Sequence, residues 1–312
     1  MNIILLGAAG FIGTNLVIEL AKDPDNKITV VDRSRDFFET IQSKNIPGLS
    51  ILESEFDLNT DFDKLVAGQD VVYHLVSTIV PTTSNRTIPN EIMANVVMSA
   101  ALFEACVQQG VKKVVFISSG GTIYDKDAVC PLDENAPTNP ITSYGVQKIT
   151  IEKLLYMYHY MHGLDYRIIR LSNPYGPYQR PNGILGAVTT FTYKALKDEE
   201  IVVYGDGSVV RDFIYIDDAV RGILNIVNGN DEQHVYNLGC GYGTSIRQVL
   251  KTLEKALDKK VDVRFTEGRK VDVPVNFLNI ARYESAYGCL NPISLEEGIR
   301  KTAQFLREFY GL

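Results

Sequence analysis

The sequence predicts an α/β protein, a Rossmann-like doubly wound parallel sheet with a smaller, interwoven C-terminal domain. Two observations predict this class. Short apolar runs alternate with helical patterns over the first 170 residues, and a glycine-rich turn follows the first of these runs. Continuous apolar runs are typical of strands buried on both faces, and repeated strand–helix–strand units form parallel sheets through right-handed crossovers.

The elements of the first half follow from these runs. Buried strands are predicted at "NIILLG" (2–7), "KITVVD" (27–32), "DVVYHLV" (70–76), "KKVVFISS" (112–119) and "YRIIRLS" (166–172). Helices are predicted between them at 11–22, 90–110 and 144–162. This alternation places the carboxyl ends of all these strands at one edge of the sheet.

The second half has a different pattern. The segment "NPYGPYQRPNGILG", from Asn173, is rich in Pro, Gly and Tyr and is predicted to be a loop. It is followed by a helix near 184–198, the run "HVYNLG", a helix near 245–257, the short strand "VDVRF" and a C-terminal amphipathic helix. Ser294 is the expected N-cap of that helix, with Glu297 at the capping-box position.

The change of pattern also predicts two domains. The expected first domain comprises residues 1–172 with roughly 210–240, and the second comprises 173–209 and 241–312.

Composition and charge narrow the possible partners. The 312 residues carry a net charge of -7, which argues against nucleic acid, because phosphate backbones need a basic surface. The apolar N-terminus is too short and too rich in glycine to span a membrane, and it lacks the basic start of a signal peptide. The four cysteines have no metal-ligand spacing, so we expect reduced thiols, no metal site and a cytoplasmic protein.

The stretch "GAAGFIG" places Gly7, Gly10 and Gly13 between the first strand and the first helix. A turn without Cβ atoms lets a pyrophosphate approach the backbone and the N–H groups of the helix N-terminus. Asp32 ends the second strand, where a carboxylate accepts hydrogen bonds from an adenosine ribose. Its charge disfavours a 2′-phosphate, so NAD is expected rather than NADP, although Arg33 and Arg35 lie close by.

Tyr144 and Lys148 are four residues apart on a predicted helix and therefore share a face. An ammonium roughly 6 Å from a phenol stabilises the phenolate by about 3 kcal/mol, which lowers a pKa near 10 by about two units. Such a tyrosine can accept a proton from a hydroxyl group while hydride leaves the same carbon. The pattern alone is common on protein surfaces, but after a dinucleotide-binding turn it favours catalysis.

The Tyr144/Lys148 pair, "GAAGFIG", "VVYHLVS", "NVVMSA", "NPYGP" and "VRDFIYIDD" together resemble the extended short-chain dehydrogenase/reductase family. Within that family the chain is most similar to nucleotide-sugar 4-epimerases of the UDP-glucose/UDP-N-acetylglucosamine type. The resemblance covers nearly the whole chain, and "RDFIYIDD" and "NPYGP" are more specific than the glycines.

The resemblance implies a set of residues that bind NAD. Asp57 and Leu58 would flank the adenine, and Leu75 and Ser77 would line the cofactor. His74 would do so too, unless it is a core histidine at the end of its strand. The full expected set is Gly7, Gly10, Phe11, Ile12, Gly13, Asp32, Arg33, Asp57, Leu58, Leu75, Ser77, Asn95, Ser118, Tyr144, Lys148 and Leu171.

The resemblance also implies a nucleotide-sugar site in the second domain. Arg211 and Arg269 would bind the diphosphate, Asp272 the uridine ribose, and Asn173 the substrate near its phosphates. Arginine forks suit diphosphate oxygens, and a carboxylate suits a diol. The expected set is Asn173, Asn182, Gly183, Ile184, Tyr204, Arg211, Arg269, Asp272 and Asn276.

The segment "SSGGTIYD" departs from the family pattern. Similar enzymes place a serine or threonine, which relays the proton of the reacting sugar oxygen, where this chain has Gly120. Ser119 and Thr122 are the nearby hydroxyls, and we expect them to replace it jointly. Related 4,6-dehydratases carry an Asp-Glu pair directly after that hydroxyl, whereas Gly120 and Gly121 supply no acid.

Asn276 lies where similar epimerases gate the sugar pocket. A tyrosine there excludes an N-acetyl group, and a smaller residue admits it. Asparagine is small and can donate a hydrogen bond to an acetyl carbonyl. The expected substrates are therefore UDP-GlcNAc and UDP-GalNAc, with UDP-glucose and UDP-galactose as further substrates.

The expected reaction is NAD-dependent epimerisation at C4 of a UDP-hexose through a transient 4-keto sugar. Alternatives of the same fold are a nucleotide-sugar reductase, a decarboxylase, a 4,6-dehydratase and an epimerase of polyprenyl-diphosphate-linked sugars. An alternative of another class is a regulator that binds NAD without chemistry. Related proteins pair through the helices near 90–110 and 144–162, so a homodimer is expected.

Overall fold

The computed structural model describes residues 1–183, 185–269 and 272–312, and the chain divides into two compact units. Unit 1 contains Met1–Ile123, Thr142–Ile169 and Glu232–Val235. Unit 2 contains Tyr124–Ile141, Arg170–Asp231 and Tyr236–Leu312. The units differ from the predicted division, because residues 124–141 and 210–231 pack within unit 2.

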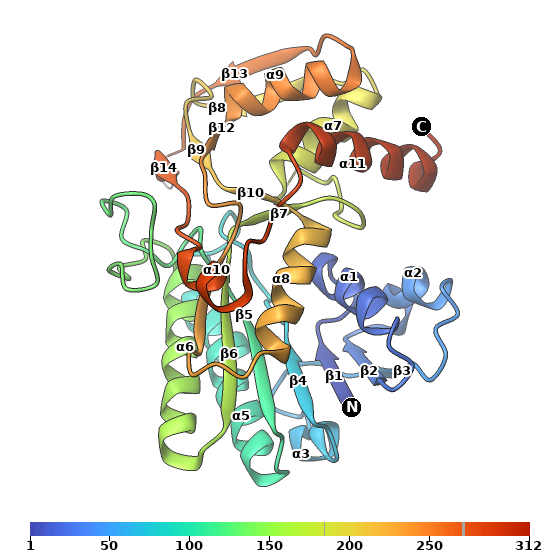
Figure 1. Ribbon diagram of the computed structural model, residues 1–312, viewed down its shortest axis with the longest axis vertical. Helices are drawn as coiled ribbons and strands as arrows, with labels where there is room; N and C mark the ends of the chain where they lie inside the picture. Colours follow the sequence, from blue (N-terminus) through green and yellow to red (C-terminus); the bar gives the residue numbers. More distant parts are fainter. Residues whose placement is uncertain (184, 270–271) are drawn as a thin grey trace. The chain divides into compact units, whose positions relative to one another are not determined.

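A seven-stranded sheet of order β11-β6-β5-β4-β1-β2-β3 lies mostly in unit 1, whereas the end of β6 and most of β11 belong to unit 2 (Figure 1). Strand β1 pairs in parallel with β2 and β4, β2 with β3, and β4 with β5. The chain runs from β1 outward to β3 and then returns to β4 beside β1, so the strand order reverses there. The carboxyl ends at such a reversal form the ligand-binding edge of a doubly wound sheet. The strands are β1 (Asn2–Leu6), β2 (Lys27–Asp32), β3 (Ser50–Glu53), β4 (Val71–His74), β5 (Lys113–Ser119), β6 (Asp165–Leu171) and β11 (Val235–Leu238).

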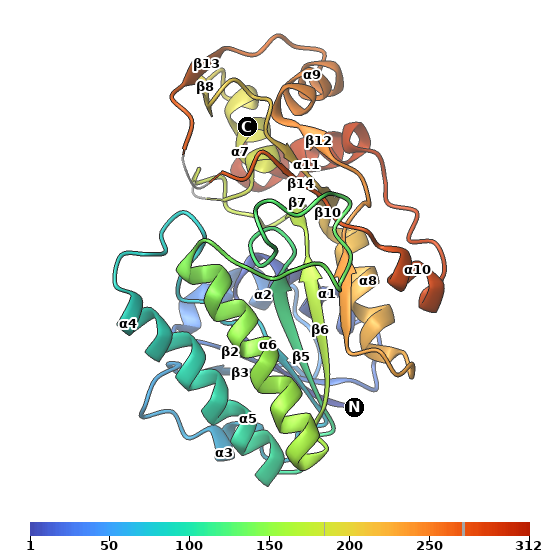
Figure 2. The same cartoon turned by 90° about the vertical axis from the view of Figure 1, so that its left-hand side faces the viewer.

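The helices of unit 1 alternate with these strands. Figure 2 shows α5 and α6 side by side over one face of the sheet. Their inward faces join the strands in a core that includes Leu102, Phe103 and Leu155. The helical segments are α1 (Phe11–Leu20), η1 (Arg35–Phe38), α2 (Glu39–Gln42), α3 (Phe62–Val66), α4 (Ile88–Ile92), η2 (Met93–Val97), α5 (Met98–Gln108) and α6 (Ser143–His162).

Two details of unit 1 differ from the sequence-based expectation. The helix predicted at 90–110 consists of α4, one π-helical turn η2, and α5. Strand β3 was not predicted, because it lies at the sheet edge and is mostly exposed, so it has no buried apolar run. By length and composition Ile88–Gln108 could cross a membrane, and 44% of its most apolar window is buried inside the protein.

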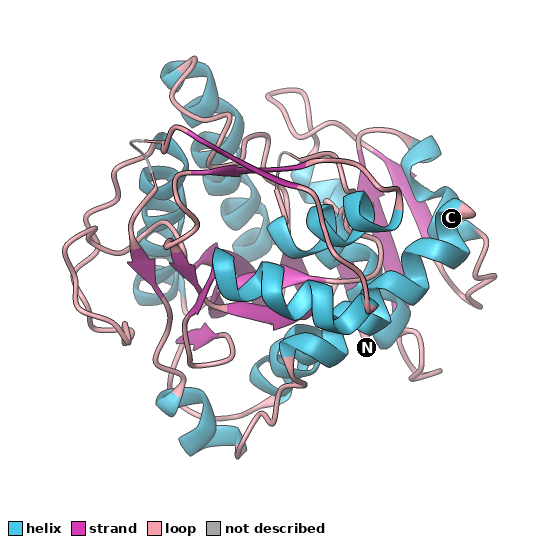
Figure 3. Cartoon of the chain, turned by 90° about the horizontal axis from the view of Figure 1, so that it is seen from above, coloured by secondary structure: helices cyan, strands magenta, loops and turns pink. Residues whose placement is uncertain are grey.

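Unit 2 combines short strands with helices, which Figure 3 distinguishes by colour. Strands β10 and β7 pair, β9 lies between β12 and β14, and β13 pairs with β8. Ser294 caps the last helix by accepting a hydrogen bond from Glu297 N, as predicted. The elements are β7 (Asn173–Tyr175), α7 (Ala187–Leu196), β8 (Ile201–Tyr204), β9 (Val210–Arg211), β10 (Phe213–Tyr215), α8 (Ile216–Asn228), β12 (Thr244–Ser245), α9 (Ile246–Leu257), β13 (Val263–Thr266), β14 (Val275–Asn276), α10 (Ala281–Tyr287) and α11 (Leu295–Tyr310).

Candidate active site

The glycine turn between β1 and α1 has no room for side chains. Gly7 has φ +80°, and a Cβ on it would lie 3.0 Å from Val76 N at the end of β4. A Cβ on Gly13 would lie 2.5 Å from Ala8 O. The predicted turn is therefore bare backbone that leads into the N-terminus of α1, and this fits the pyrophosphate of a dinucleotide.

Asp32 is bonded to this turn. Its carboxylate accepts hydrogen bonds from Ala9 N at 3.1 Å and from Arg33 N at 2.9 Å. The Arg33 guanidinium lies over the Phe37 ring, 5.4 Å from the ring centroid. A carboxylate at the end of β2 thus faces the turn, which fits an adenosine ribose with free hydroxyls better than one with a 2′-phosphate.

The other residues predicted to bind NAD lie along the same sheet edge or its loops. Leu75 follows β4 and donates through its N–H to Leu6 O, whereas Ser77 bonds to Ile79 O. The Asp57 side chain closes a turn by accepting a hydrogen bond from Asn59 N, and Leu58, between them, is 72% exposed. Buried Leu171 ends β6. Phe11 and Ile12 begin α1, after the N-cap Gly10.

His74 lies in the core of unit 1. Its Nε2 lies 2.7 Å from Ser99 Oγ, which itself donates to Asn95 O. The ring packs against Phe56 and Phe116. Burial, helped by the Lys148 charge, lowers the pKa of His74 to about 3, so the imidazole is neutral.

Tyr144 and Lys148 lie in the first two turns of α6, as predicted. Lys148 is buried, and its Nζ donates to Ile117 O of β5 at 2.9 Å. The same Nζ lies 5.6 Å from the centroid of the Tyr144 ring and 4.6 Å from that of Phe116. Sequence spacing and the bond to β5 together hold the ammonium beside the phenol.

The predicted direction of the Tyr144 pKa is wrong for the protein without NAD. Burial raises the pKa of Tyr144 to about 12. Burial also lowers the pKa of Lys148 to about 8, although the nearby Glu152 carboxylate acts to raise it. The ammonium attracts the phenolate, but removing the phenolate from water costs more. Tyr144 keeps part of its surface exposed, so a bound positively charged nicotinamide ring can reverse this balance.

Ser119 and Thr122 form the expected hydroxyl pair at the end of β5. Thr122 Oγ1 donates to Ser119 Oγ at 2.8 Å. The Ser119 hydrogen is therefore directed to a different acceptor, and Ser119 can donate it while Thr122 supports the oxygen. Ser118, on the opposite face of the strand, donates instead to buried Glu152.

A small recess, with room for about one water molecule, lies beside the Tyr144/Lys148 pair. Asn95, in the π-helical turn η2, donates to Gln147 Oε1 at 2.9 Å, and both line the recess. Asn95 was predicted by the resemblance, whereas Gln147 was missed, although its place directly before Lys148 could have pointed to it. The lining residues are Val76, Ser77, Asn95, Tyr144, Gln147, Lys148 and Ile151.

Unit 2 brings the predicted phosphate and ribose residues together. Arg269 forms a two-pronged ion pair with Asp272, at 2.9 and 3.1 Å, and its guanidinium lies 4.6 Å from the Tyr204 ring centroid. Arg211 donates to Val273 O. Burial lowers the pKa of Arg211, and the charge of Asp272 opposes this effect. Two arginines and a carboxylate thus form one cluster.

Asn276 is buried in β14 directly beside Arg211 of β9, its partner in the parallel pairing. The Asn173 side chain donates a hydrogen bond to Asp212 O at 2.9 Å. Asp212 directly follows Arg211 in the sequence. Gly183 has φ +73° and open space around it. Asn182 belongs to the same loop of unit 2, and Ile184 lies outside the described residues.

The side chains present do not suggest a metal site. Among residues 1–183, 185–269 and 272–312, no group of three or more His, Cys, Asp or Glu side chains is arranged to hold an ion. All four cysteines are free thiols.

Comparisons with known proteins identify the family of the chain. A model of the NAD dependent epimerase/dehydratase family matches residues 3–239. A UDP-glucose 4-epimerase of Mycolicibacterium smegmatis is 31% identical over 98% of this chain and 99% of its own. The structure of a UDP-glucose 4-epimerase from Thermotoga maritima with UDP-glucose has a TM-score of 0.91 at 31% identity, covering 99% and 100% of the two chains. A UDP-N-acetylglucosamine 4-epimerase from Methanobrevibacter ruminantium M1 has a TM-score of 0.90 at 28% identity, covering 99% and 98%.

Proposed function

Since the chain belongs to the NAD dependent epimerase/dehydratase family, we propose that it inverts carbon 4 of a UDP-hexose. The proposed substrates are UDP-GlcNAc and UDP-GalNAc, with UDP-glucose and UDP-galactose as further substrates. The observation that carries this proposal is the buried Lys148 beside Tyr144, in a unit that also contains the bare glycine turn.

The protein's own groups supply proton transfer. NAD, when bound, accepts a hydride from the sugar carbon and returns it. Tyr144 accepts the proton of the C4 hydroxyl and later gives it back, and Lys148 stabilises the phenolate from its position 5.6 Å from the ring. Lys148 stays oriented because β5 accepts one of its hydrogen bonds.

Ser119 and Thr122 are the proposed hydroxyl relay. Thr122 donates to Ser119, so Ser119 has its own hydrogen free to bond the reacting sugar oxygen. A correctly placed hydroxyl of this kind contributes about 10²- to 10⁴-fold in rate. The pair stands in for the hydroxyl that similar enzymes carry at the position of Gly120.

Unit 1 is the proposed NAD-binding unit, and unit 2 is the proposed nucleotide-sugar unit. Arg211 and Arg269 are proposed to bind the diphosphate and Asp272 the uridine ribose. Arg269 is bonded to Asp272, so both groups are held within reach of one ligand. A nucleotide bound at this cluster can stay in place while its sugar rotates between the two hydride transfers.

Other reactions of the same fold are weaker candidates. Relatives include a UDP-N-acetyl-alpha-D-glucosaminuronate decarboxylase of Bacillus cytotoxicus and a dTDP-4-dehydro-6-deoxyglucose reductase of Escherichia coli. A reductase would consume added NADH or NADPH, and a decarboxylase would release carbon dioxide. The glycines after Ser119 provide no acid for dehydration at carbon 6.

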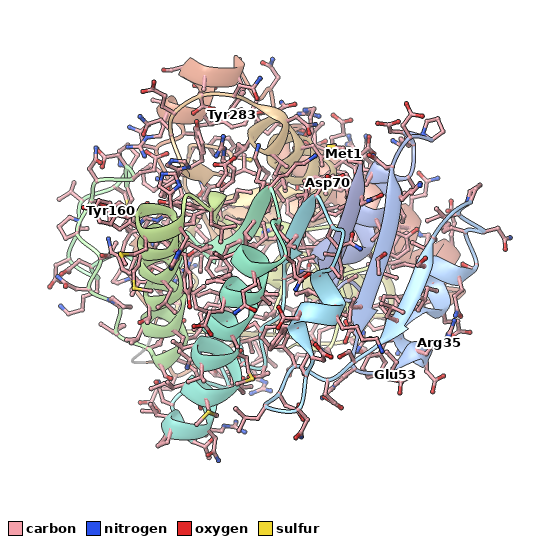
Figure 4. The ribbon with its side chains drawn as sticks, turned by 90° about the horizontal axis from the view of Figure 1, so that it is seen from below. Met1, Arg35, Glu53, Asp70, Tyr160 and Tyr283 are labelled. Carbon is pink, nitrogen blue, oxygen red and sulfur yellow. The ribbon has the colours of Figure 1, made fainter. Side chains whose placement is uncertain are left out.

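We also propose a homodimer formed through α5 and α6. Tyr160, labelled in Figure 4, projects outward from α6 and is 79% exposed. Tyr156, Met157 and Met161 on the same helix are 60%, 45% and 63% exposed. Large apolar side chains gathered on one helix are typical of a protein interface.

The decisive assay incubates the purified, NAD-loaded protein with UDP-GlcNAc and separates the UDP-sugars. We expect UDP-GalNAc to form to equilibrium without added cofactor and without net NADH. Turnover of UDP-glucose alone would refute the N-acetyl preference but keep the reaction type. No turnover of any UDP-hexose, with intact NAD content, would overturn the proposed function.

A further inference from the structure

Glu91 of α4 is a buried carboxylate outside the proton-transfer chemistry. It is 4% exposed and forms no ion pair among the residues that the structure describes. Its oxygens accept hydrogen bonds from Arg86 N and Thr87 N, both at 3.1 Å, and from Ser143 Oγ at 2.7 Å. Asn85 N adds a longer bond of 3.4 Å. A buried charge is costly unless it is hydrogen-bonded. The four hydrogen bonds that the Glu91 carboxylate accepts therefore point to a specific role.

The Ser143 bond begins a chain of buried polar groups. Gln147 Nε2 donates to Ser143 Oγ at 2.7 Å, and Gln147 Oε1 accepts from Asn95 Nδ2 at 2.9 Å. Asn95 Oδ1 then accepts from Thr78 N at 2.9 Å. Every member of the chain lies in unit 1. Ser143 directly precedes Tyr144, and Gln147 directly precedes Lys148.

Both ends of this chain dictate the same direction of hydrogen bonding. A carboxylate can only accept, so Ser143 must donate to Glu91 and accept from Gln147. A backbone N–H can only donate, so Asn95 must offer Oδ1 to Thr78 and Nδ2 to Gln147. Each amide therefore has one permitted orientation.

Glu91 also joins α6 to the loop before α4. Its carboxylate accepts hydrogen bonds from the backbone N–H groups of residues 85–87. Asn85 Oδ1 in turn accepts a hydrogen bond from Ser143 N, in the first turn of α6, at 2.7 Å. Asn85 itself has φ +73°, a conformation that needs such support. The loop and the first turn of α6 are thus held by one carboxylate.

We propose that Glu91 is a positioning residue: through Ser143 and Gln147 it fixes the turn of α6 that presents Tyr144 and Lys148 to the recess. The inference rests on the proposed function of that pair. The charge that acts on Lys148 is that of Glu152, on the same helix, while His74 from β4 is neutral. Glu91 acts by geometry, because its oxygens are bonded to Ser143 and the loop amides.

Glu91→Gln puts an amide where only acceptors fit. If the new NH₂ group faces Ser143, the chain must reverse, and Asn95 then presents Nδ2 to Thr78 N. If it faces the loop, the N–H groups of Arg86 and Thr87 lose their acceptor. Either arrangement loosens the first turns of α6, so Lys148 moves relative to Tyr144.

The test compares NAD-loaded wild type, Glu91→Gln and Glu39→Gln, an exposed glutamate of α2 that serves as the matched control. One readout is the tyrosinate titration of Tyr144, taken as the absorbance difference from the same protein with Tyr144→Phe. It needs no sugar substrate. We expect the Tyr144 pKa to rise by about one unit in Glu91→Gln, equivalent to a tenfold loss of phenolate, and not to move in the control.

The second readout is turnover of whichever UDP-sugar the wild type converts. We expect kcat to fall about 10- to 100-fold with KM nearly unchanged, since a small displacement of a catalytic group costs this much. The proposal fails if folded, NAD-loaded Glu91→Gln titrates like wild type, or if its activity falls only in proportion to NAD content. A wild type without turnover refutes the proposed function instead, and the titration still decides this inference.

Ser143→Ala and Ser143→Thr keep the proposal testable if Glu91→Gln does not fold. Alanine breaks the chain at its centre but leaves the loop amides bonded to Glu91, and threonine restores the hydroxyl. The alanine variant should show the same rise in the Tyr144 pKa, and threonine should largely reverse it. Equal titrations in both variants would overturn the proposal.

Discussion

Lys148 carries a charge that the fold disfavours. Burial lowers its pKa from 10.5 to about 8, so between these pH values the unfolded chain binds more protons than the native protein. Stability from this group therefore rises as pH increases through that window, and the buried charge costs about 3 kcal/mol at neutral pH. In NAD-free protein, Lys148→Met should thus gain stability relative to wild type at pH 7 and lose that gain by pH 10.5. Thermal unfolding of both proteins over this range measures it, and a pH-independent difference would contradict the cause assigned to the pKa.

Asn276 sets the expected choice of sugar. It is buried beside Arg211, so a larger side chain there must project into the same site. Asn276→Tyr should reduce kcat/KM for UDP-GlcNAc about 10- to 200-fold, the range that one steric group in a pocket achieves, and change UDP-glucose much less. Asn276→Ser, which is small, serves as the control. Equal losses for both sugars would remove Asn276 from the specificity argument.

At the scale of elements, the contact between the glycine turn and α1 is the feature that prepares unit 1 for a dinucleotide. A Cβ on Gly13 would lie 2.5 Å from Ala8 O, and backbone cannot move aside as a flexible side chain can. Gly13→Ala should therefore displace the start of α1, cost about 1–3 kcal/mol and strongly reduce bound NAD. Gly68→Ala is the control: its φ of +69° also strains alanine, but no atom lies within 4 Å. Absorbance of NAD released on denaturation reports the content, and full NAD occupancy in Gly13→Ala would count against this account of the turn.

The elements that sequence predicted best are those with local causes. Strand β2 and helix α6 follow from unbroken apolar runs and helical spacing, and the turn follows from its glycines. Glu91 was missed because a single glutamate on a predicted helix is typical of a solvent-facing residue. Its burial depends on the loop amides just before α4 and on Ser143, which is 52 residues away in sequence. The Tyr144 pKa was predicted in the wrong direction for the same reason, since spacing reveals the nearby charge but not the loss of solvent.

At the scale of the whole molecule, the two-unit organisation and the parallel sheet were predictable, but the path of the chain between units was not. Residues 124–141 interrupt unit 1 and pack in unit 2. Contacts between segments that are distant in sequence decide to which unit a segment belongs. The nucleotide-sugar cluster likewise came from the resemblance, because Arg211, Arg269 and Asp272 separately look like surface charges.

The proposed dimer gives a test at this scale. Tyr160→Arg places a charge on the exposed apolar face of α6 and should convert the protein to monomers at micromolar concentration, as measured by analytical ultracentrifugation. Val129→Arg, at an apolar position of unit 2 that is 88% exposed, should leave the assembly unchanged. A wild-type monomer, or a dimer that survives Tyr160→Arg, would exclude α6 as the interface.

The most direct test of the central claim follows the hydrogen on carbon 4. NAD-loaded protein is incubated with UDP-GlcNAc deuterated at that carbon, and the product is analysed by mass spectrometry. If Tyr144 and Lys148 drive inversion with a retained cofactor, UDP-GalNAc keeps the deuterium, and Tyr144→Phe forms no product despite normal NAD content. Loss of the deuterium to water, or normal turnover by Tyr144→Phe, would contradict the account.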